Sequence, residues 1–331
     1  MGSVARVGSH LSIHDYLGTI RARIGIARNQ YRLNPGLYCI GKPTADSPVF
    51  VTANYKLSFD ALRKELSDID AWILVTDTRG INVWCAAGKG TFIADEVALQ
   101  VKRSRLAEIV SHRELILPQL AAPGVAIYEL NKKCGFKGIF GPIRAADISL
   151  YLSSGKHADE RMRAVTFTFS ERLVLVPVEI ALIWKLFTLV ILSVFILSGI
   201  GPGLFSISAA FSRGVIVSGA TVIAIIAGAL VTPVLLPFIP GRQFWWKGLL
   251  SGGVTGIIYV LSIKTDGSIL EAISIWIWIV ATASYMAMNF TGATPYTSLS
   301  GVKKEMQQGL IFQCGGACVA VLLWIASPFM V

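Results

Sequence analysis

The stretch AWILVTDTRGINVWCAAGK, residues 71–89, decides the fold of the first half of the chain. Its first seven residues form a short apolar run that ends in Thr and Asp, a pattern typical of a buried strand followed by a turn. Residues 78–80 supply the turn, and the segment after it favours a helix. Cys85 is therefore expected near the N-terminus of a helix that follows a buried strand.

The sequence on both sides of this stretch repeats the same alternation. Strands are predicted over residues 48–54, 114–117 and 136–140, with helical patterns between them. Strands that alternate with helices predict a mostly parallel, Rossmann-like α/β sheet covered on both faces. Ligands of such sheets bind at the carboxyl ends of the strands. Near those ends lie four candidate cofactor-binding residues: Thr76, Gln119, Gly141 and Pro142.

The second half of the chain has a different composition. Before residue 173 lie 23 of the 30 Lys and Arg residues and 16 of the 20 Asp and Glu residues. Hydrophobic residues make up 53% of the whole chain. Long uncharged stretches predict an all-α transmembrane bundle of about five helices. The expected spans are residues 180–198, 215–236, 245–263, 269–289 and 309–327. The predicted domains are a cytoplasmic domain (1–165), a charged connector (166–178) and a transmembrane domain (179–331).

The distribution of charge bears on the partners and on the orientation in the membrane. The net charge is +10, but the basic residues are interspersed with acidic ones and form no basic run. We therefore expect no nucleic-acid partner and expect contact with membrane lipid instead. The N-terminus has no apolar core of a signal peptide. The expected inner loops hold Arg242, Lys247, Lys303 and Lys304, whereas the outer loops hold Arg213 and Lys264. This bias predicts a protein of the cytoplasmic membrane with its N-terminal domain inside and its C-terminus outside.

Cys85 is the candidate that carries chemistry. The positive end of a helix dipole favours a thiolate, which can act as a nucleophile or as a ligand of a soft metal. The small residues Ala86, Ala87 and Gly88 would let a large flat ligand approach the backbone. The residues alone leave a second interpretation open, because free cysteines are often simply buried. The other four cysteines have no CxxC or zinc spacing, and Cys314 and Cys318 are more typical of a helix-packing surface than of a metal relay.

The string NVWCAAGK, residues 82–89, resembles the signature of the HgcA family, the membrane-anchored corrinoid proteins of microbial mercury methylation. Residues 71–152 also resemble the corrinoid-binding domain in the large subunit of the corrinoid iron–sulfur protein. The resemblance implies a cobalamin-type corrinoid with Cys85 as the lower axial ligand of cobalt. It also implies that the helix beneath the corrin ring consists of Asn82, Val83, Trp84, Cys85, Ala86, Ala87, Gly88 and Lys89.

The same resemblance implies the activity and the partners. The family passes a methyl group from methyl-Co(III) corrinoid to Hg(II), which forms methylmercury. Its reductant is an HgcB-type ferredoxin with two [4Fe–4S] clusters, and its methyl donor is linked to methyltetrahydrofolate. Two other functions stay open: a corrinoid methyl carrier of one-carbon metabolism with another acceptor, and a membrane transporter or sensor. Few helix breaks and no charge at the centre of an expected span argue against a transporter.

Overall fold

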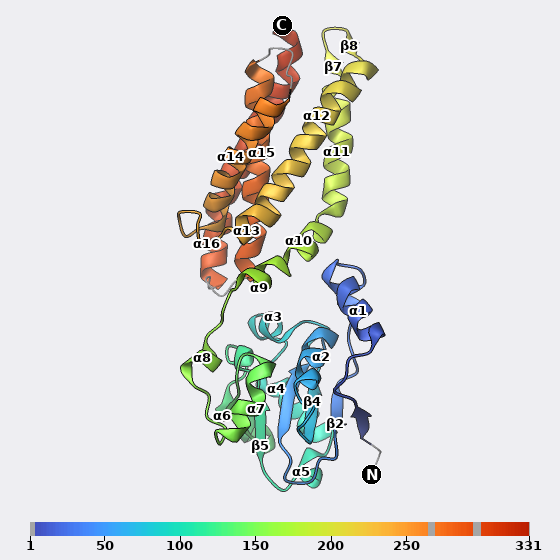
Figure 1. Ribbon diagram of the computed structural model, residues 1–331, viewed down its shortest axis with the longest axis vertical. Coiled ribbons are helices and arrows are strands. Elements are labelled where there is room, and N and C mark those ends of the chain that lie inside the picture. Colours follow the sequence, from blue (N-terminus) through green and yellow to red (C-terminus); the bar gives the residue numbers. More distant parts are fainter. Residues whose placement is uncertain (1–3, 264–268, 294–298, 331) are drawn as a thin grey trace. The chain divides into compact units, whose positions relative to one another are not determined.

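The computed structural model describes residues 4–263, 269–293 and 299–330, and the chain forms two compact units, Met1–Val165 and Thr166–Val331. The N-terminal unit is an α/β domain around a six-stranded sheet (Figure 1). Its strands are β1 (Ala5–Val7), β2 (Gly36–Ile40), β3 (Val49–Ala53), β4 (Ala71–Thr76), β5 (Glu114–Leu117) and β6 (Lys137–Phe140). Its helices are α1 (Ile13–Arg23), α2 (Lys56–Lys64), α3 (Val83–Gly88), α4 (Ala94–Arg103), α5 (Leu106–Ile109), α6 (Ile127–Cys134), α7 (Ile148–Ser153) and α8 (Glu160–Arg163), with 3-10 turns η1 (Arg28–Gln30), η2 (Gln119–Ala121) and η3 (Ala145–Asp147).

The strand order is β1-β2-β4-β3-β5-β6, and all four strands predicted from the sequence are present. The pairs β3–β4, β3–β5 and β5–β6 are parallel, as predicted. Strand β2 pairs antiparallel with β4, and β1 pairs parallel with β2. These two strands come from the first 40 residues, whose weak hydrophobic alternation gives no strand signal in the sequence.

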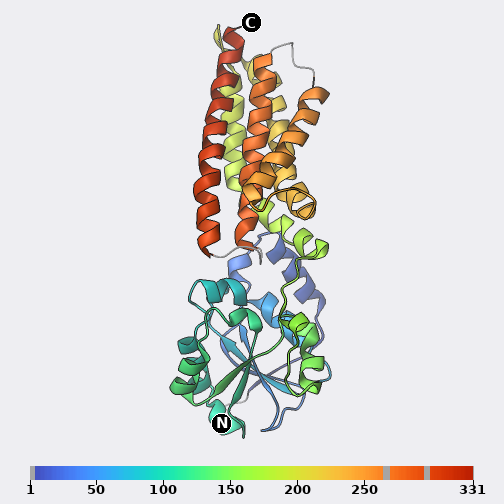
Figure 2. The same cartoon turned by 90° about the vertical axis from the view of Figure 1, so that its left-hand side faces the viewer.

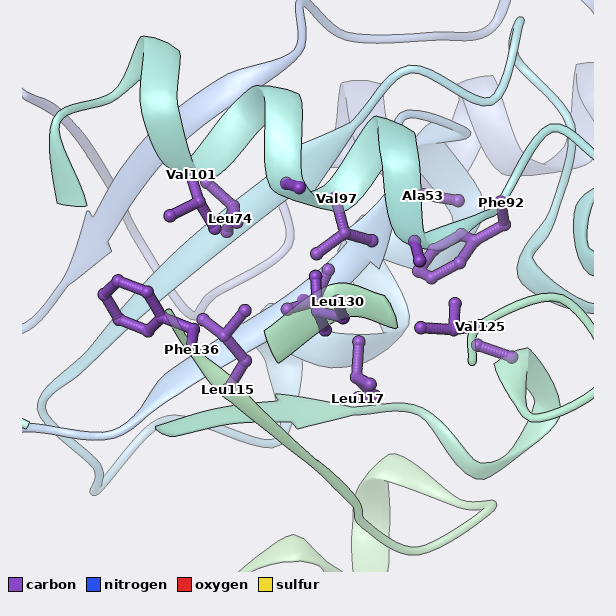
Figure 3. Packing of buried hydrophobic residues seen from close by; sticks show 14 of the residues in the cluster. Ala53, Leu74, Phe92, Val97, Val101, Leu115, Leu117, Val125, Leu130 and Phe136 are labelled. Atoms are coloured by element: carbon purple, nitrogen blue, oxygen red, sulfur yellow. The ribbon is translucent and has the colours of Figure 1, made fainter. Parts of the chain in front are cut away.

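Both faces of the sheet are buried, and the alternation along each strand divides the core in two. Leu74 of β4 belongs to the core beneath α4 and α6, whereas its neighbours Ile73 and Val75 belong to the core on the other face. Successive side chains of a strand point to opposite faces, which explains this division. Figure 3 shows the first core, where Val97 of α4 and Leu130 of α6 pack toward the strands.

The C-terminal unit is helical (Figure 2). Among the described residues, three helices are long and apolar enough to cross a membrane, Ile207–Val234, Ile269–Gly292 and Ser300–Phe329, or four if the bent pair Phe169–Leu182 and Trp184–Ser198 is one span. Its elements are α9 (Phe169–Leu173), α10 (Val176–Leu182), α11 (Trp184–Ser198), β7 (Ile200–Gly201), β8 (Leu204–Phe205), α12 (Ile207–Ile226), the π-helical turn η4 (Ala227–Val231), α13 (Thr232–Val234), α14 (Phe244–Ser262), α15 (Ile269–Asn289), η5 (Phe290–Ala293), α16 (Leu299–Ala326) and η6 (Ser327–Phe329).

The span expected over residues 245–263 is present as helix α14, but it is not among these membrane-length apolar helices. Its sequence contains Lys247 and several glycines, which lower its hydropathy. Two of those glycines lie against α15: a Cβ on Gly248 would come within 2.7 Å of Ala287, and a Cβ on Gly252 within 2.8 Å of Ala283. Small residues at such spacing let two helix backbones approach closely, so α14 is built for helix packing.

The charges used to predict the orientation do not all lie in loops. Arg213 is part of α12, where its Nε donates to Glu271 Oε1 at 2.8 Å and its guanidinium lies 4.2 Å from the centre of the Trp324 ring. Lys247 is buried in α14, and Lys264 lies outside the described residues. The orientation in the membrane therefore stays a prediction.

Candidate functional site

The candidate site lies at the carboxyl ends of β3 and β4, where one side chain shapes the loop that leads to α3. Asn54 is 2% exposed, and its Oδ1 accepts hydrogen bonds from Thr78 N at 3.1 Å, Thr78 Oγ1 at 2.9 Å and Gly80 N at 2.9 Å. Its Nδ2 donates to Asp77 Oδ1 at 3.0 Å. Asn54 thus fixes the turn because its amide satisfies buried groups on both sides of it. Gly80 has a φ of +75°, which favours glycine at this point of the turn.

Helix α3 places Cys85 on the exposed side of this edge. Asn82 is the N-cap residue, and its side chain accepts a hydrogen bond of 2.8 Å from the backbone N–H of Cys85. Cys85 is exposed, whereas Ala86 and Ala87 are buried in the core below. The two alanines of NVWCAAGK therefore pack the helix against the core, whereas a Cβ added to Gly88 would meet no other atom within 4 Å.

The helix is held tightly from the opposite side by the segment after β5. A Cβ on Gly124 would lie 2.3 Å from the carbonyl oxygen of Phe92 and 2.9 Å from Ala87 Cα, so glycine is required there by close packing. The turn η2 also packs against α3. Within η2, Gln119 has a buried Oε1 without a hydrogen-bond partner among the described residues. A buried acceptor without a donor is costly, which marks Gln119 as a group that a ligand could satisfy.

A cavity of about 340 Å³ opens beside the start of α3. Its walls are mostly apolar and come from β3, α2, β5 and the segment after β6. Five of the residues predicted from the sequence line it: Asn82, Val83, Trp84, Gly141 and Pro142. An apolar cavity with a few polar groups at its mouth is the usual form of a cofactor site.

Not all predicted residues meet in this cavity. Thr76 is fully buried, and its hydroxyl donates to Thr52 O at 3.0 Å, a bond that joins β4 to β3. Lys89 is exposed just beyond α3. Cys85 faces solvent rather than the cavity wall, as its exposure and the lining residues show. The exposed thiol and the residues that line the cavity therefore lie on different faces of the same short helix.

The N-terminal segment contributes residues that the sequence pattern did not single out. Tyr55, at the end of β3, is 5% exposed and its hydroxyl has no hydrogen-bond partner within the described chain. Burial raises the pKa of Tyr55; the nearby cations Arg28 and Arg23 lower it, while Cys85 raises it further. Arg28 lies over the Tyr55 ring at 5.8 Å from its centre. These residues lie close together only because the segment around η1 folds back onto the loop before α3.

The cysteines differ in their surroundings. Cys39 is buried and Cys134 is half-buried, with its Sγ at 3.2 Å from Leu130 O, whereas Cys314 and Cys318 are exposed on α16. Within the described ranges, no three side chains of His, Cys, Asp or Glu gather into a group that could hold a metal ion.

Comparisons with known proteins match the N-terminal unit. Residues 13–151 match the family described as CdhD, CO dehydrogenase/acetyl-CoA synthase delta subunit. The acetyl-CoA decarbonylase/synthase complex subunit gamma of Archaeoglobus fulgidus is 32% identical over 144 residues, which are 42% of this chain and 30% of that protein. The corresponding subunit of Methanopyrus kandleri is 37% identical over 97 residues, 29% of this chain and 21% of that protein. That of Methanosarcina acetivorans is 37% identical over 125 residues, 37% of this chain and 26% of that protein.

This chain spans less than a third of the length of these curated relatives. The matched region contains the sheet from β2 to β6, the helix with Cys85 and the cavity beside it. The similarity therefore concerns the α/β unit, and the helical unit has no counterpart in the matched residues.

Proposed function

We propose that the chain is a corrinoid-dependent methyltransferase that transfers a methyl group to Hg(II) and so forms methylmercury. Residues 1–165 are the cytoplasmic corrinoid-binding domain, 166–178 a connector, and 179–331 the membrane domain of about five spans. The similarity of residues 13–151 to subunits of the acetyl-CoA decarbonylase/synthase complex supports a corrinoid domain with methyl transfer. The three or four membrane-length helices support a membrane protein. The choice of mercury rests on the string NVWCAAGK.

The observation that carries the proposal is the exposed thiol of Cys85 at the start of a capped helix on the carboxyl edge of a parallel sheet. The surroundings fit a corrinoid, which is large, flat and carries amide arms around its ring. Gln119 Oε1 and the Tyr55 hydroxyl are buried and have no hydrogen-bond partner in the described parts of the chain, so amide groups can satisfy them. The apolar cavity beside α3 offers a place for an apolar part of the cofactor.

The residues of the chain divide the work as follows. When bound, the corrinoid supplies a cobalt-held methyl group for the soft acceptor Hg(II). Cys85 is the residue that would hold cobalt, because a thiolate is a soft, electron-rich ligand. Asn82 holds the backbone of Cys85 in place, and Asn54 holds the loop before it. Ala87 packs against Gly124, which holds the helix that carries Cys85 in place.

Two partners follow from the proposal. No cluster of metal-binding side chains occurs in the described parts of the chain, so low-potential electrons must come from another protein. An HgcB-type ferredoxin with two [4Fe–4S] clusters is the proposed reductant, and a methyltetrahydrofolate-linked protein the proposed methyl donor.

A second function is favoured by the comparisons themselves. The relatives are subunits of the acetyl-CoA decarbonylase/synthase complex, so a methyl carrier of one-carbon metabolism with another acceptor is the alternative. The same corrinoid site would serve both functions. Methylation rates with Hg(II) and with arsenite, measured on the same preparation, distinguish the two functions. A preference for arsenite, or turnover of neither acceptor, favours the methyl carrier.

The site is tested by replacing Cys85 in the full chain. Cys85→Ala and Cys85→Thr should leave the fold intact, because the side chain is exposed, but should abolish methylmercury formation. Cys85→His should retain some corrinoid with a changed visible spectrum and a severe loss of turnover, since imidazole donates less electron density. Cys318→Ala is the matched control, because Cys318 is also an exposed helix cysteine.

The measurements are the visible spectrum of bound cobalt and the methylmercury formed with reduced ferredoxin and a methyl donor supplied. Wild-type activity of Cys85→Ala would refute the assignment of the ligand. Loss of activity in Cys318→Ala with normal activity in Cys85→Ala would place the site in the helical unit instead.

A further inference from the structure

A second cavity, of about 380 Å³, lies in the C-terminal unit and is lined by basic residues. Its walls come from α9, from the segment between α13 and α14, and from the first turn of α14. The lining residues are Arg172, Leu236, Pro237, Gly241, Arg242, Phe244 and Lys247. Three cations and no acidic residue stand among the described residues that line it.

Two of the three cations are buried. Arg172 is 6% exposed, and its Nε has no hydrogen-bond partner among the described residues. Lys247 is 8% exposed, and its Nζ donates to Leu236 O at 2.5 Å. An ammonium group has three donors, so this bond leaves Lys247 able to donate to a further acceptor in the cavity. A buried guanidinium with an unmatched N–H is costly unless an acceptor is supplied from elsewhere.

The carboxylates that are near in sequence or structure serve other groups. Glu305 accepts a hydrogen bond of 2.9 Å from Trp245 N, at the beginning of α14. Glu171, next to Arg172, accepts from Thr168 N at 2.7 Å within the capping box of α9. Neither carboxylate lines the cavity. The positive charge of the cavity thus calls for an anion from outside the chain.

The surroundings of the cavity point to the level of lipid headgroups. Trp246 is exposed at the beginning of α14, and tryptophan is enriched where a membrane protein meets the bilayer surface. Arg172 lies in the first helix of the bent pair, before the three helices that are each of membrane length, so the cavity lies at the end of the bundle where the chain enters it. Basic pockets at the ends of membrane helices bind anionic headgroups through charge-assisted hydrogen bonds.

We propose that this cavity binds the phosphate group of an anionic phospholipid, held by Arg172, Arg242 and Lys247. The proposal goes beyond the methyl-transfer function and does not depend on it. The lipid phosphate would pair with the positive charges of the cavity, so the helical unit would have a specific lipid ligand.

The test is native mass spectrometry of the full chain in detergent, titrated with phosphatidylglycerol, with phosphatidylcholine or with inorganic phosphate. Wild type should retain phosphatidylglycerol in preference to the other two probes. Arg242→Gln should weaken its retention about fivefold and Arg172→Gln about tenfold, because each removes a cation that contacts the phosphate. Arg172→Lys, which keeps the charge, should retain most of the binding.

Lys304→Gln is the matched control, since Lys304 is an exposed cation near the start of α16 and outside the cavity. Its retention of phosphatidylglycerol should equal that of wild type. Equal losses in Lys304→Gln and Arg242→Gln would overturn the site in favour of diffuse surface charge. Equal retention of phosphatidylcholine, or displacement of phosphatidylglycerol by inorganic phosphate, would also overturn the proposal, because neither fits a site for an anionic lipid.

Discussion

Replacing Asn54 by alanine should loosen the loop that carries α3. The change removes four hydrogen bonds: three accepted by Asn54 Oδ1 from Thr78 and Gly80, and one donated by Nδ2 to Asp77. The Thr78 hydroxyl keeps its bond of 2.6 Å to Ile81 O. The backbone N–H groups of Thr78 and Gly80, however, are left buried and unpaired.

Two unpaired buried donors set the size of the effect. Each costs roughly 1–3 kcal/mol, so the folded loop should lose about 2–6 kcal/mol of stability against local opening. Since about 1.4 kcal/mol corresponds to a factor of ten, the opening equilibrium should rise by roughly 30- to 20,000-fold. Because the loop leads directly to Asn82 and Cys85, the affinity for a corrinoid should fall as well.

Hydrogen exchange of the full chain, followed by mass spectrometry on peptides that cover residues 77–88, measures this opening. Asn131→Ala is the control, because Asn131 is exposed on α6. Asn54→Asp keeps an acceptor for the three donors but faces Asp77 with a like charge, so it should lie between wild type and Asn54→Ala. Exchange in Asn54→Ala no faster than in Asn131→Ala would refute the role assigned to Asn54.

Two further predictions concern the segments packed around the site. Burial alone would raise the pKa of Asp15, but hydrogen bonds from Lys56 and Ser12 outweigh it and hold the pKa well below its ordinary value of 3.8. The stabilisation is therefore fully present above that ordinary value and is lost as the pH falls through the folded pKa. Asp15→Asn removes it at neutral pH, where trypsin is active, and should free α1 for cleavage by trypsin. Gly124→Ala should lower the thermal midpoint of the full chain, because the added methyl group would press into the backbone of Ala87.

The controls for these two predictions come from the same unit. Asp46→Asn removes an exposed carboxylate outside the α1 network and should leave trypsin cleavage of α1 unchanged. Gly8→Ala adds a methyl group where no atom lies within 4 Å of it, so the thermal midpoint should stay at the wild-type value. Equal cleavage of Asp15→Asn and wild type, or equal midpoints for Gly124→Ala and Gly8→Ala, would contradict the packing described above.

Much of the α/β unit follows from local sequence patterns. The apolar runs of β3, β4, β5 and β6 are short and bounded by turn residues, and all four form strands as predicted. A strand buried on both faces needs such a run whatever its neighbours are, so its sequence is sufficient to find it. The same holds for Cys85, since a cysteine just after a strand and a turn must lie near the start of the next helix.

Local sequence patterns did not predict the strands of the N-terminal segment or the lower apolarity of α14. Strand β2 pairs antiparallel with β4 along its whole length, yet three of its five residues are only partly buried and the strand shows no clear alternation. Helix α14 is a helix as predicted, but its glycines serve contact with α15 rather than lipid. Both features depend on a neighbour that is distant in the sequence.

By itself, the sequence determined that a parallel α/β unit precedes apolar helices and that Cys85 begins a helix at the ligand-binding edge. Only the tertiary structure decided that Asn54 reaches over 24 residues to Thr78, that Ala86 faces the core while Cys85 faces solvent, and that Arg172 shares a cavity with Lys247. The physical reason is that apolar periodicity records whether a residue is buried, which is a local property of one element. Which polar groups meet is set by strand register and helix packing, and these are fixed only when the whole chain has folded.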